Sequence, residues 1–335
     1  MIREFHHIDL TARNSFRVAQ RAARLVEFDR ADDLGRLFAD GGPAEWYLLG
    51  GGNNILFTRD YEGTLLTPVG RTIERLGEEG DRVRVRAEAG VEWDDLVAWA
   101  VERGLWGLEN LSLIPGTVGA APVQNIGAYG AEAKDTIEAV EMFCTETCNT
   151  LILDASHCGF GYRDSVFKRE LRGRAIITAV RFALSRTPQP RLGYGDLERE
   201  TAARGGATLR NIREAVCAIR RAKLPDPAVT GNAGSFFKNP AVDRPTAERL
   251  LARWPDMPHY PAPDGRVKLA AGWLIDRAGW KGRTEGRVGV HERQALVLVN
   301  RGGATGAEVP AFAARVRQAV LERFGVAIET EVNIL

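Results

Sequence analysis

Two hydrophobic periods, one of two residues and one of three to four, are interleaved along this chain. Residues 81–91, DRVRVRAEAGV, have Val or Ala at every second position among charged neighbours, which predicts a half-buried strand. Residues 92–105, EWDDLVAWAVERGL, have acids in the first turn and apolar residues on one side, which predicts a helix that stops at Gly104. Residues 173–184, GRAIITAVRFAL, predict another strand.

The last third of the chain continues this mixture. Residues 247–254 and 270–280 are predicted to be helical, and residues 291–300 contain a buried strand. Residues 308–325, EVPAFAARVRQAVLERFG, predict a long amphipathic helix with a proline near its start and a glycine near its end. The final stretch AIETEVNIL alternates and predicts a strand. Its expected faces are Ile328, Thr330, Val332 and Ile334 on one side and Glu329, Glu331 and Asn333 on the other.

These elements lack the regular βαβ alternation of a doubly wound sheet, so we expect an α+β fold. The Pro/Gly-rich stretch LPDPAVTGNAG, residues 224–234, predicts a domain boundary. The chain has 335 residues, of which 44% are hydrophobic and 27% charged, enough for two or three domains with their own cores.

Charge and cysteine content narrow the function classes. The net charge of +1 gives no sign of nonspecific binding to nucleic acid or to an anionic membrane surface. No apolar run is long enough to span a bilayer, and the start MIREFHHIDL has acids and histidines where a signal peptide needs an apolar core, so we expect no signal peptide there. The four cysteines contain no C-x-x-C pair, which argues against zinc, and we expect no metal. Reduced thiols in the cytoplasm are the expected state.

Glycine-rich stretches are the strongest candidates for a cofactor site. The dinucleotide fingerprint G-x-G-x-x-G is absent, because Ile55 and Asp164 stand where its third glycine would fall in 49–56 and 159–164. A Rossmann fold is therefore not expected.

Two other glycine-rich runs remain: residues 47–57, YLLGGGNNILF, and 114–130, IPGTVGAAPVQNIGAYG. Each alone is compatible with a tight turn. Together they favour two loops whose backbone N–H groups hold a diphosphate-bearing cofactor.

Four further residues have both a structural and a functional interpretation. Arg163 is either a surface charge or a clamp for a carboxylate, and Lys223 either ends a helix or binds a phosphate. Ser235, in GNAGSFFKNP, is either a turn residue or a reactive hydroxyl, although it lacks the G-x-S-x-G pattern of hydrolases. Glu331 alone would be an ordinary exposed carboxylate.

Six motifs occur in one order on this chain and carry a specific resemblance. They are IPGTVGAAPVQNIGAYG, FGYRDSVFK, KLPDP, GNAGSFFKNP, KLAAGWLIDRAGWKG and the terminal IETEV. With them, from about residue 10 to the C-terminus, the chain resembles the UDP-N-acetylenolpyruvoylglucosamine reductase family, which makes UDP-N-acetylmuramate for bacterial peptidoglycan. LGYGDL, residues 192–197, resembles the tyrosine-bearing loop of its type I branch. Asn53 and Thr117 depart from the serines commoner at those positions.

The resemblance implies a two-subdomain FAD-binding region of the vanillyl-alcohol-oxidase type and a C-terminal α+β substrate-binding domain. The implied domains are 1–75, 76–223 and 224–335, with a terminal strand that packs back on the FAD region. It further implies noncovalent FAD, NADPH as reductant and a UDP-sugar substrate. No histidine or cysteine stands in the glycine-rich loops to tether a flavin. We expect no obligate protein partner.

The resemblance also assigns roles to single residues. Ser235 matches the proton donor, and Arg163 and Glu331 match its two partners. Substrate or NADPH positions are Tyr162, Tyr194, Lys223, Asn239 and Gln294. The FAD-binding positions are Gly50, Gly51, Gly52, Asn53, Asn54, Pro115, Gly116, Thr117, Gly119, Ala120, Asn125, Ile126, Gly127 and Arg220.

The implied chemistry suits these residue types. Hydride addition to an enol ether needs a sink for negative charge, which Arg163 and a protonated Glu331 would provide. A basic carbanion would then take a proton from Ser235. Three alternatives stay open: another flavin oxidoreductase, a sugar-nucleotide-binding regulator with an inactive flavin site, and a serine hydrolase. The regulator would not need all three catalytic residues, and the hydrolase lacks a convincing His/Asp pair.

Overall fold

The computed structural model describes residues 2–262 and 264–335. The chain forms two compact units. Unit 1 comprises the residues up to Ile8, Ala22–Gly51 and Glu62–Ala222. Unit 2 comprises Asp9–Arg21, Gly52–Tyr61 and Lys223–Leu335. Helices and mainly antiparallel sheets occur in both, which confirms the predicted α+β class. The division into three domains stays a prediction.

A four-stranded sheet opens the chain. Its strands, in spatial order, are β1 (Arg3–Asp9), β2 (Arg21–Phe28), β5 (Tyr61–Pro68) and β3 (Trp46–Leu48). Helix α1 (Ala31–Phe38) buries Leu34 and Phe38 in a cluster with Phe28 and Leu66 of this sheet. Burial of such side chains contributes about 1.5–3 kcal/mol each, which attaches α1 to the strands.

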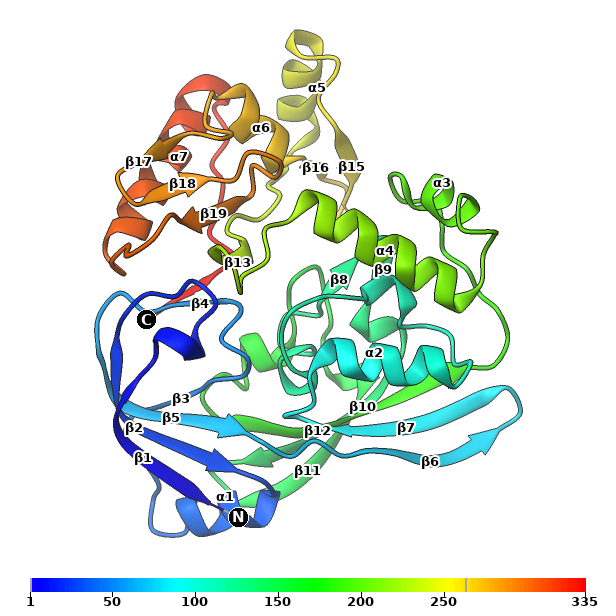
Figure 1. The fold of residues 1–335 in the computed structure, drawn as a ribbon, viewed down its shortest axis with the longest axis vertical. Coiled ribbons are helices and arrows are strands. Elements are labelled where there is room, and N and C mark those ends of the chain that lie inside the picture. Colours follow the sequence, from blue (N-terminus) through cyan, green and yellow to red (C-terminus); the bar gives the residue numbers. More distant parts are fainter. Residues whose placement is uncertain (1, 263) are drawn as a thin grey trace. The chain divides into compact units, whose positions relative to one another are not determined.

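A five-stranded antiparallel sheet is the framework of unit 1 (Figure 1). Its strands, in spatial order, are β11 (Asn149–Asp154), β10 (Ile137–Cys144), β12 (Ala175–Ser185), β7 (Arg82–Glu88) and β6 (Ile73–Glu79). Strands β7 and β12 confirm the two predictions made for this region. Helix α2 (Trp93–Glu102) also matches its prediction, and Gly104 ends it with a φ of +69°. Its buried Trp93 packs with Val83 and Val85 on one face of the sheet.

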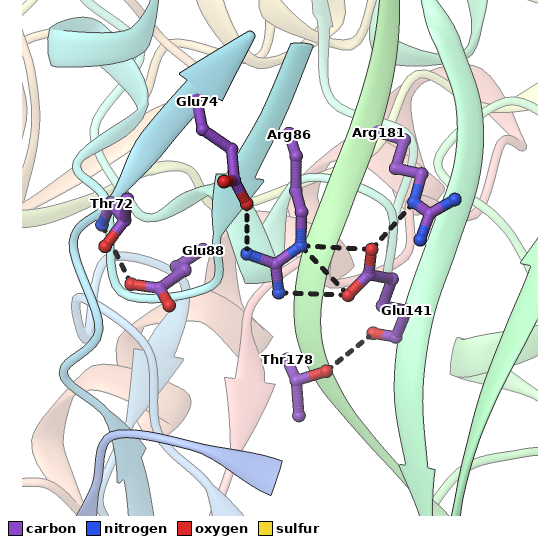
Figure 2. Close-up of polar contacts among 7 residues, drawn as sticks. All are labelled: Thr72, Glu74, Arg86, Glu88, Glu141, Thr178 and Arg181. Carbon is purple, nitrogen blue, oxygen red and sulfur yellow. Dashed lines mark hydrogen bonds and ion pairs between the residues drawn. The ribbon is translucent and has the colours of Figure 1, made fainter. Parts of the chain in front are cut away.

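The opposite face of this sheet holds a buried carboxylate between two arginines (Figure 2). Arg86 and Arg181 lie directly opposite each other on β7 and β12, where like charges repel. Glu141 on β10 accepts hydrogen bonds from Nε of Arg86 at 3.0 Å and from Nε of Arg181 at 2.7 Å. Burial acts to raise the pKa of Glu141, but the hydrogen bonds and charges of both arginines outweigh it, and the pKa is lowered.

The remaining elements of unit 1 are two helices and two short strands. They are α3 (Leu197–Ala202), α4 (Leu209–Lys223), β8 (Gly127–Ala128) and β9 (Ala131–Glu132). The apolar face of α4 packs with Trp106 and Leu197 in a separate cluster.

Unit 2 is built from three small sheets and three helices. Its first sheet, in spatial order, contains β13 (Gly231–Ser235), β19 (Val297–Asn300), β18 (Val288–Val290) and β17 (Thr284–Glu285). The second contains β14 (Ala241–Val242), β16 (Val267–Leu269) and β15 (His259–Pro261), and the third pairs β20 (Asn333–Ile334) with β4 (Ile55–Leu56). The helices are α5 (Arg244–Arg253), α6 (Ala271–Arg277) and α7 (Glu308–Phe324).

The predicted helices and the buried strand of this unit are confirmed. Helix α5 begins three residues before the predicted 247–254, because Asp243 caps it by accepting a hydrogen bond from Thr246 N at 2.8 Å. Gly325 ends α7 in the left-handed conformation, with a φ of +67°. The segment around Phe16 joins this unit, since its carbonyl accepts a hydrogen bond from Asn300 Nδ2 at 2.9 Å.

The prediction of a terminal strand over 327–335 is wrong for most of this segment, because only Asn333–Ile334 form a regular strand. Glu331 N donates to Phe236 O at 2.8 Å, whereas Asn333 N donates to Asn54 O at 3.1 Å. The chain therefore changes its hydrogen-bonding partner within three residues, and only β20 is regular. Ile334 is 45% exposed, contrary to the predicted apolar face. Within the described ranges, every helix is too short or too polar to cross a membrane.

Candidate functional site

The part of the first glycine-rich loop that belongs to unit 1, up to Gly51, lies beside the second loop. A Cβ atom on Gly50 would come within 3.0 Å of Thr117 Oγ1 and 3.5 Å of the Ala120 side chain. A side chain at position 50 would therefore require the Thr117 hydroxyl to move by a few tenths of an ångström, so glycine suits this close approach of the two loops. Gly51 and Pro115, from the same two loops, are exposed.

The second loop is fixed by its backbone to the end of β7 and the start of α2. Gly119 N donates to Ala89 O at 3.0 Å, and Trp93 N donates to Gly116 O at 2.8 Å. Gly116 has a φ of +126°, which favours glycine, and a Cβ on Gly119 would lie 2.6 Å from the Ala89 side chain. These contacts hold the loop in one conformation before any ligand binds.

Thr117, in the second loop, has a buried hydroxyl beside Gly50 of the first loop. Among the residues that the structure describes, its Oγ1 has no hydrogen-bond partner, and the residue is 7% exposed. An unpaired buried polar atom costs about 1–3 kcal/mol, so such an atom indicates a missing partner. A bound ligand with a polar atom at this point would supply that partner.

Asn125 is held in place by hydrogen bonds within the protein. Its side-chain Nδ2 donates to Glu132 Oε2 and Gly161 O, both at 3.0 Å, and its Oδ1 accepts from Lys134 N at 3.0 Å. Its φ of +45° lies in the left-handed region. Asn125 thus joins the turn before Gly127 to the segment before Arg163. Ile126 is half-buried beside the sheet core.

Arg163 lies beside the end of the second glycine loop. Its Nη2 donates to Gly127 O at 3.2 Å, and its guanidinium carbon lies 5.8 Å from the centre of the Tyr162 ring. Its φ of +54° is unusual for a residue with a side chain. Tyr162 is 43% exposed. The backbone is thus held in a strained conformation that directs Arg163 toward the predicted cofactor loop.

Arg220 is a second cation of the same region. Its Nε donates to Leu113 O at 3.1 Å. Burial lowers the pKa of Arg220, and the charge of Arg163 lowers it further against the opposing effect of Tyr129. Tyr129 in turn packs edge-on against Tyr194, with 6.0 Å between ring centres. Two neighbouring half-buried cations form a favourable environment for an anion.

Ser235 stands at the end of β13 in unit 2. It pairs with Val297 after an irregularity in the strand register, and Gly234 before it has a φ of +68°. Asn232 Oδ1 accepts from Gly234 N at 2.9 Å and so fixes the bend. Ser235 remains half-buried, and the two residues that follow it, Phe236 and Phe237, are 0% and 1% exposed.

The terminal segment brings Glu331 beside Ser235. Glu331 N donates to Phe236 O at 2.8 Å, and Phe237 pairs with Thr330 across an isolated bridge. Both predicted catalytic residues of unit 2 therefore lie on two adjacent chain segments, although they are almost 100 positions apart in the sequence.

Two predicted substrate residues meet at the start of α6. Asn239 Oδ1 accepts from Ala271 N at 2.9 Å, and Gln294 Oε1 lies 3.4 Å from where a Cβ on Gly272 would be. Lys223, by contrast, is exposed at the last position of α4.

Three residues of the first glycine-rich loop, Gly52, Asn53 and Asn54, belong to unit 2. A Cβ on Gly52 would overlap the carbonyl oxygen of Arg13 at 2.1 Å, and Asn54 O accepts hydrogen bonds from both N and Nδ2 of Asn333. Asn53 between them is half-buried.

The sequence did not predict an ionic contact near Arg220, between Asp94 and Arg213. Asp94 accepts two hydrogen bonds from Arg213, at 2.6 and 2.9 Å, and a third from Leu113 N at 2.6 Å. The sequence showed Asp94 only as an acid in the first turn of a helix. The spacing of Arg213 and Arg220, seven residues apart on one helix, was the available signal that both project from the same face.

Comparison with known proteins identifies the class. Residues 38–147 match the family model of an FAD binding domain, which covers both glycine-rich loops. The orphaned Thr117 hydroxyl, the glycines that a Cβ would block and the buried Arg220 all fit a large anionic cofactor. The protein is an FAD-dependent oxidoreductase without a Rossmann fold.

The same comparisons identify the family. Residues 226–335 match the model of the UDP-N-acetylenolpyruvoylglucosamine reductase C-terminal domain. A reductase of that name from Chromobacterium violaceum is 52% identical over 98% of both chains, and one from Burkholderia cenocepacia is 54% identical over 96% of this chain and 94% of the relative. The crystal structure of the Thermus caldophilus enzyme covers 100% of this chain and 98% of its own, with a TM-score of 0.69 and 25% identity. The chain belongs to the UDP-N-acetylenolpyruvoylglucosamine reductase family.

Proposed function

We propose that this protein uses NADPH to reduce the enolpyruvyl group of UDP-N-acetyl-3-O-(1-carboxyvinyl)glucosamine, giving UDP-N-acetylmuramate for peptidoglycan synthesis. The observation that carries the proposal is the 52–54% identity to reductases of that name over 94–98% of their length. Both the flavin-binding part and the C-terminal part of such an enzyme are therefore present.

The reaction adds a hydride to the methylene carbon C3 and a proton to C2 of the enol ether. FAD, held without a covalent bond by the two glycine-rich loops, would supply the hydride, with NADPH as its reductant. The protein's own residues have two tasks: they stabilise the negative charge that develops on the substrate carboxylate, and they deliver the proton from one side.

Arg163 takes the first task. A guanidinium donates two parallel hydrogen bonds to a carboxylate, which a lysine cannot do. Its Nη2 contact with Gly127 O and its strained backbone support a preset orientation. Electrostatic groups fixed in advance stabilise a developing enediolate most effectively. Glu331, as the protonated acid, donates a further hydrogen bond to the same charge.

Ser235 takes the second task. A serine hydroxyl is a weak acid, but a carbanion at C2 is basic enough to accept its proton. The bend at Gly234 and the half-buried position of Ser235 support an oriented hydroxyl, and buried Phe236 and Phe237 behind it exclude water.

Substrate binding is assigned to Tyr162, Tyr194, Lys223, Asn239 and Gln294. The exposed tyrosines, 43% and 51% accessible, support contacts that form only when the nucleotide arrives. Because NADPH and UDP-sugars are cytoplasmic metabolites, we propose that the protein acts in the cytoplasm. Its four cysteines are all unpaired, in keeping with that compartment.

Anaerobic spectroscopy tests the function. The purified holoprotein is expected to be yellow, to lose its flavin absorbance with NADPH, and to recover it when the enolpyruvyl UDP-sugar is added. UDP-N-acetylmuramate must appear in equal amount. Bleaching without recovery on addition of this substrate would show that the protein is a different flavin oxidoreductase.

A further inference from the structure

One face of α4 carries two arginine side chains with a cysteine between them. Arg213, Cys217 and Arg220 follow each other at spacings of four and three residues, so they project from the same side of the helix. Cys217 is 7% exposed, and burial raises the pKa of its thiol. The helix thus presents two guanidinium groups, two turns apart, on either side of a neutral residue.

Asp94, at the start of α2, holds the first of these arginines. Its two carboxylate oxygens accept from Nη1 and Nη2 of Arg213 at 2.6 and 2.9 Å. Burial acts to raise the pKa of Asp94, but the hydrogen bonds from Arg213 and Leu113 N outweigh it, and the pKa is lowered. Asp94 is therefore a carboxylate at neutral pH, and the pair joins α2 to α4 by two parallel bonds.

Leu113 connects this pair to the second arginine. Its N–H donates to Asp94 Oδ1 at 2.6 Å, while its carbonyl accepts from Arg220 Nε at 3.1 Å. Leu113 has a φ of +59°, in the left-handed region that a leucine seldom adopts. The carboxylate contact secures this peptide, and the peptide in turn sets the plane of the Arg220 guanidinium.

The contact on Arg220 leaves its far donors for a ligand. Its Nε is bound to a neutral carbonyl, so Leu113 orients the cation without neutralising it. Burial and, more weakly, the charge of Arg163 lower the pKa of Arg220. An anionic oxygen at the outer donors of Arg220 would stabilise its cation.

We propose that Asp94 is a positioning residue for Arg220. Through Leu113 it fixes the guanidinium so that Nη1 and Nη2 present two parallel donors to an anionic group of a ligand, a phosphate or a carboxylate. The two sources of that chemistry are the pyrophosphate of FAD and the anionic groups of the UDP-sugar. The second source rests on the proposed function, whereas the first does not.

A double-mutant cycle tests this relay, the contact from Asp94 through Leu113 to Arg220. The variants are Asp94→Asn, Arg220→Lys and the double variant, with Asp95→Asn as a control because Asp95 is an exposed acid in the same helical turn. For each we measure the Kd of the flavin-free protein for FAD and, in the FAD-loaded enzyme, KM and kcat for the UDP-sugar and NADPH. Asp94→Asn is expected to weaken the binding of one of the two anionic ligands by about tenfold. Arg220→Lys is expected to weaken the binding of the same ligand, and the double variant is expected to bind it no more weakly than Arg220→Lys alone.

The two readouts separate the sources. A raised Kd for FAD assigns Arg220 to the flavin pyrophosphate, and a raised KM for the UDP-sugar at unchanged FAD affinity assigns it to the substrate. Asp95→Asn leaves both unchanged. The inference is overturned if Asp94→Asn lowers only the melting temperature, or if its effect adds in full to that of Arg220→Lys. Failure of the wild type to turn over the UDP-sugar would reject the proposed function, while the FAD titration would still test the relay.

Discussion

Arg163 shares an unusual backbone conformation with three neighbours of the candidate site. Leu113, Asn125 and Tyr129 also have positive φ angles, between 45° and 59°, and none is glycine. Each such residue costs about 1–3 kcal/mol and persists only where its surroundings compensate. Asn125 and Tyr129 lie within the second glycine loop, Leu113 precedes it, and Arg163 contacts it through Gly127. This concentration of strain is typical of sites that hold side chains in fixed orientations.

Arg163→Lys is expected to impair turnover severely although the charge is kept. Lysine cannot donate two parallel hydrogen bonds to a carboxylate. The loss should fall on reoxidation of the reduced flavin by the UDP-sugar, and flavin reduction by NADPH should change little. Stopped-flow absorbance of each half-reaction measures both.

Arg169→Lys is a matched control, since Arg169 is exposed and bound to Asp164 nearby. It is expected to behave as wild type. Wild-type turnover of Arg163→Lys would mean that Arg163 is a surface charge.

Single residues with a motif around them were predictable, and long-range partners were not. Ser235 and Arg163 stood out because glycines and aromatics surround them in the sequence. Asp94 did not, because its partner Arg213 lies 119 positions away and nothing in either local sequence encodes the contact. The positive φ of Leu113 was equally hidden, because a leucine predicts no such conformation.

At the scale of elements, the five-stranded sheet depends on the ionic contact shown in Figure 2. Glu141 is 8% exposed and bridges Arg86 and Arg181, which are paired directly across two strands. Removing the carboxylate leaves two half-buried cations facing each other, and Arg86 then keeps only its contact with Glu74 at 3.1 Å. Such a loss is more costly than the loss of a surface ion pair, because the remaining charges are not fully solvated.

Glu141→Gln is expected to lower the free energy of unfolding at pH 7 by about 3 kcal/mol. The pKa of Glu141 is lowered from an ordinary value of 4.5, so its charge stabilises the fold fully above that pH. The contribution disappears as the pH falls through the lowered pKa. The difference between wild type and Glu141→Gln must therefore shrink below about pH 4.5. Urea unfolding at several pH values measures it.

Glu146→Gln provides the control for this measurement, because Glu146 pairs with Arg174 at the surface. Its effect on unfolding is expected to be small at every pH. An equal effect of both variants, or a difference for Glu141→Gln that does not change with pH, would contradict the account of the buried contact.

Elements with a clear period and clear ends were predictable from the sequence. Strand β7 and helices α2 and α7 match because alternation, first-turn acids and terminal glycines all agree there. The final segment failed because its alternation is real but its hydrogen-bonding partners change. Periodicity records which side chains are buried, as with Ile328 at 0% and Val332 at 5%, and carries no information on the neighbouring strand.

At the scale of the whole molecule, FAD is expected to bind without a covalent bond. Neither glycine-rich loop contains a histidine or cysteine that would tether the flavin. Acid precipitation of the yellow protein should leave the flavin in the supernatant, where its absorbance is measured. Flavin that remains with the pellet would contradict this prediction.

In the proposed reaction, Ser235 delivers the proton to C2. Stopped-flow reoxidation of the NADPH-reduced flavin by the enolpyruvyl UDP-sugar in Ser235→Ala tests this role. We predict that NADPH reduces this variant at the wild-type rate, because that half-reaction needs no proton at C2. Reoxidation is predicted to slow by roughly 10²–10⁴-fold, and Ser235→Cys to recover part of it. Reoxidation of Ser235→Ala as fast as in wild type would show that Ser235 is only a turn residue.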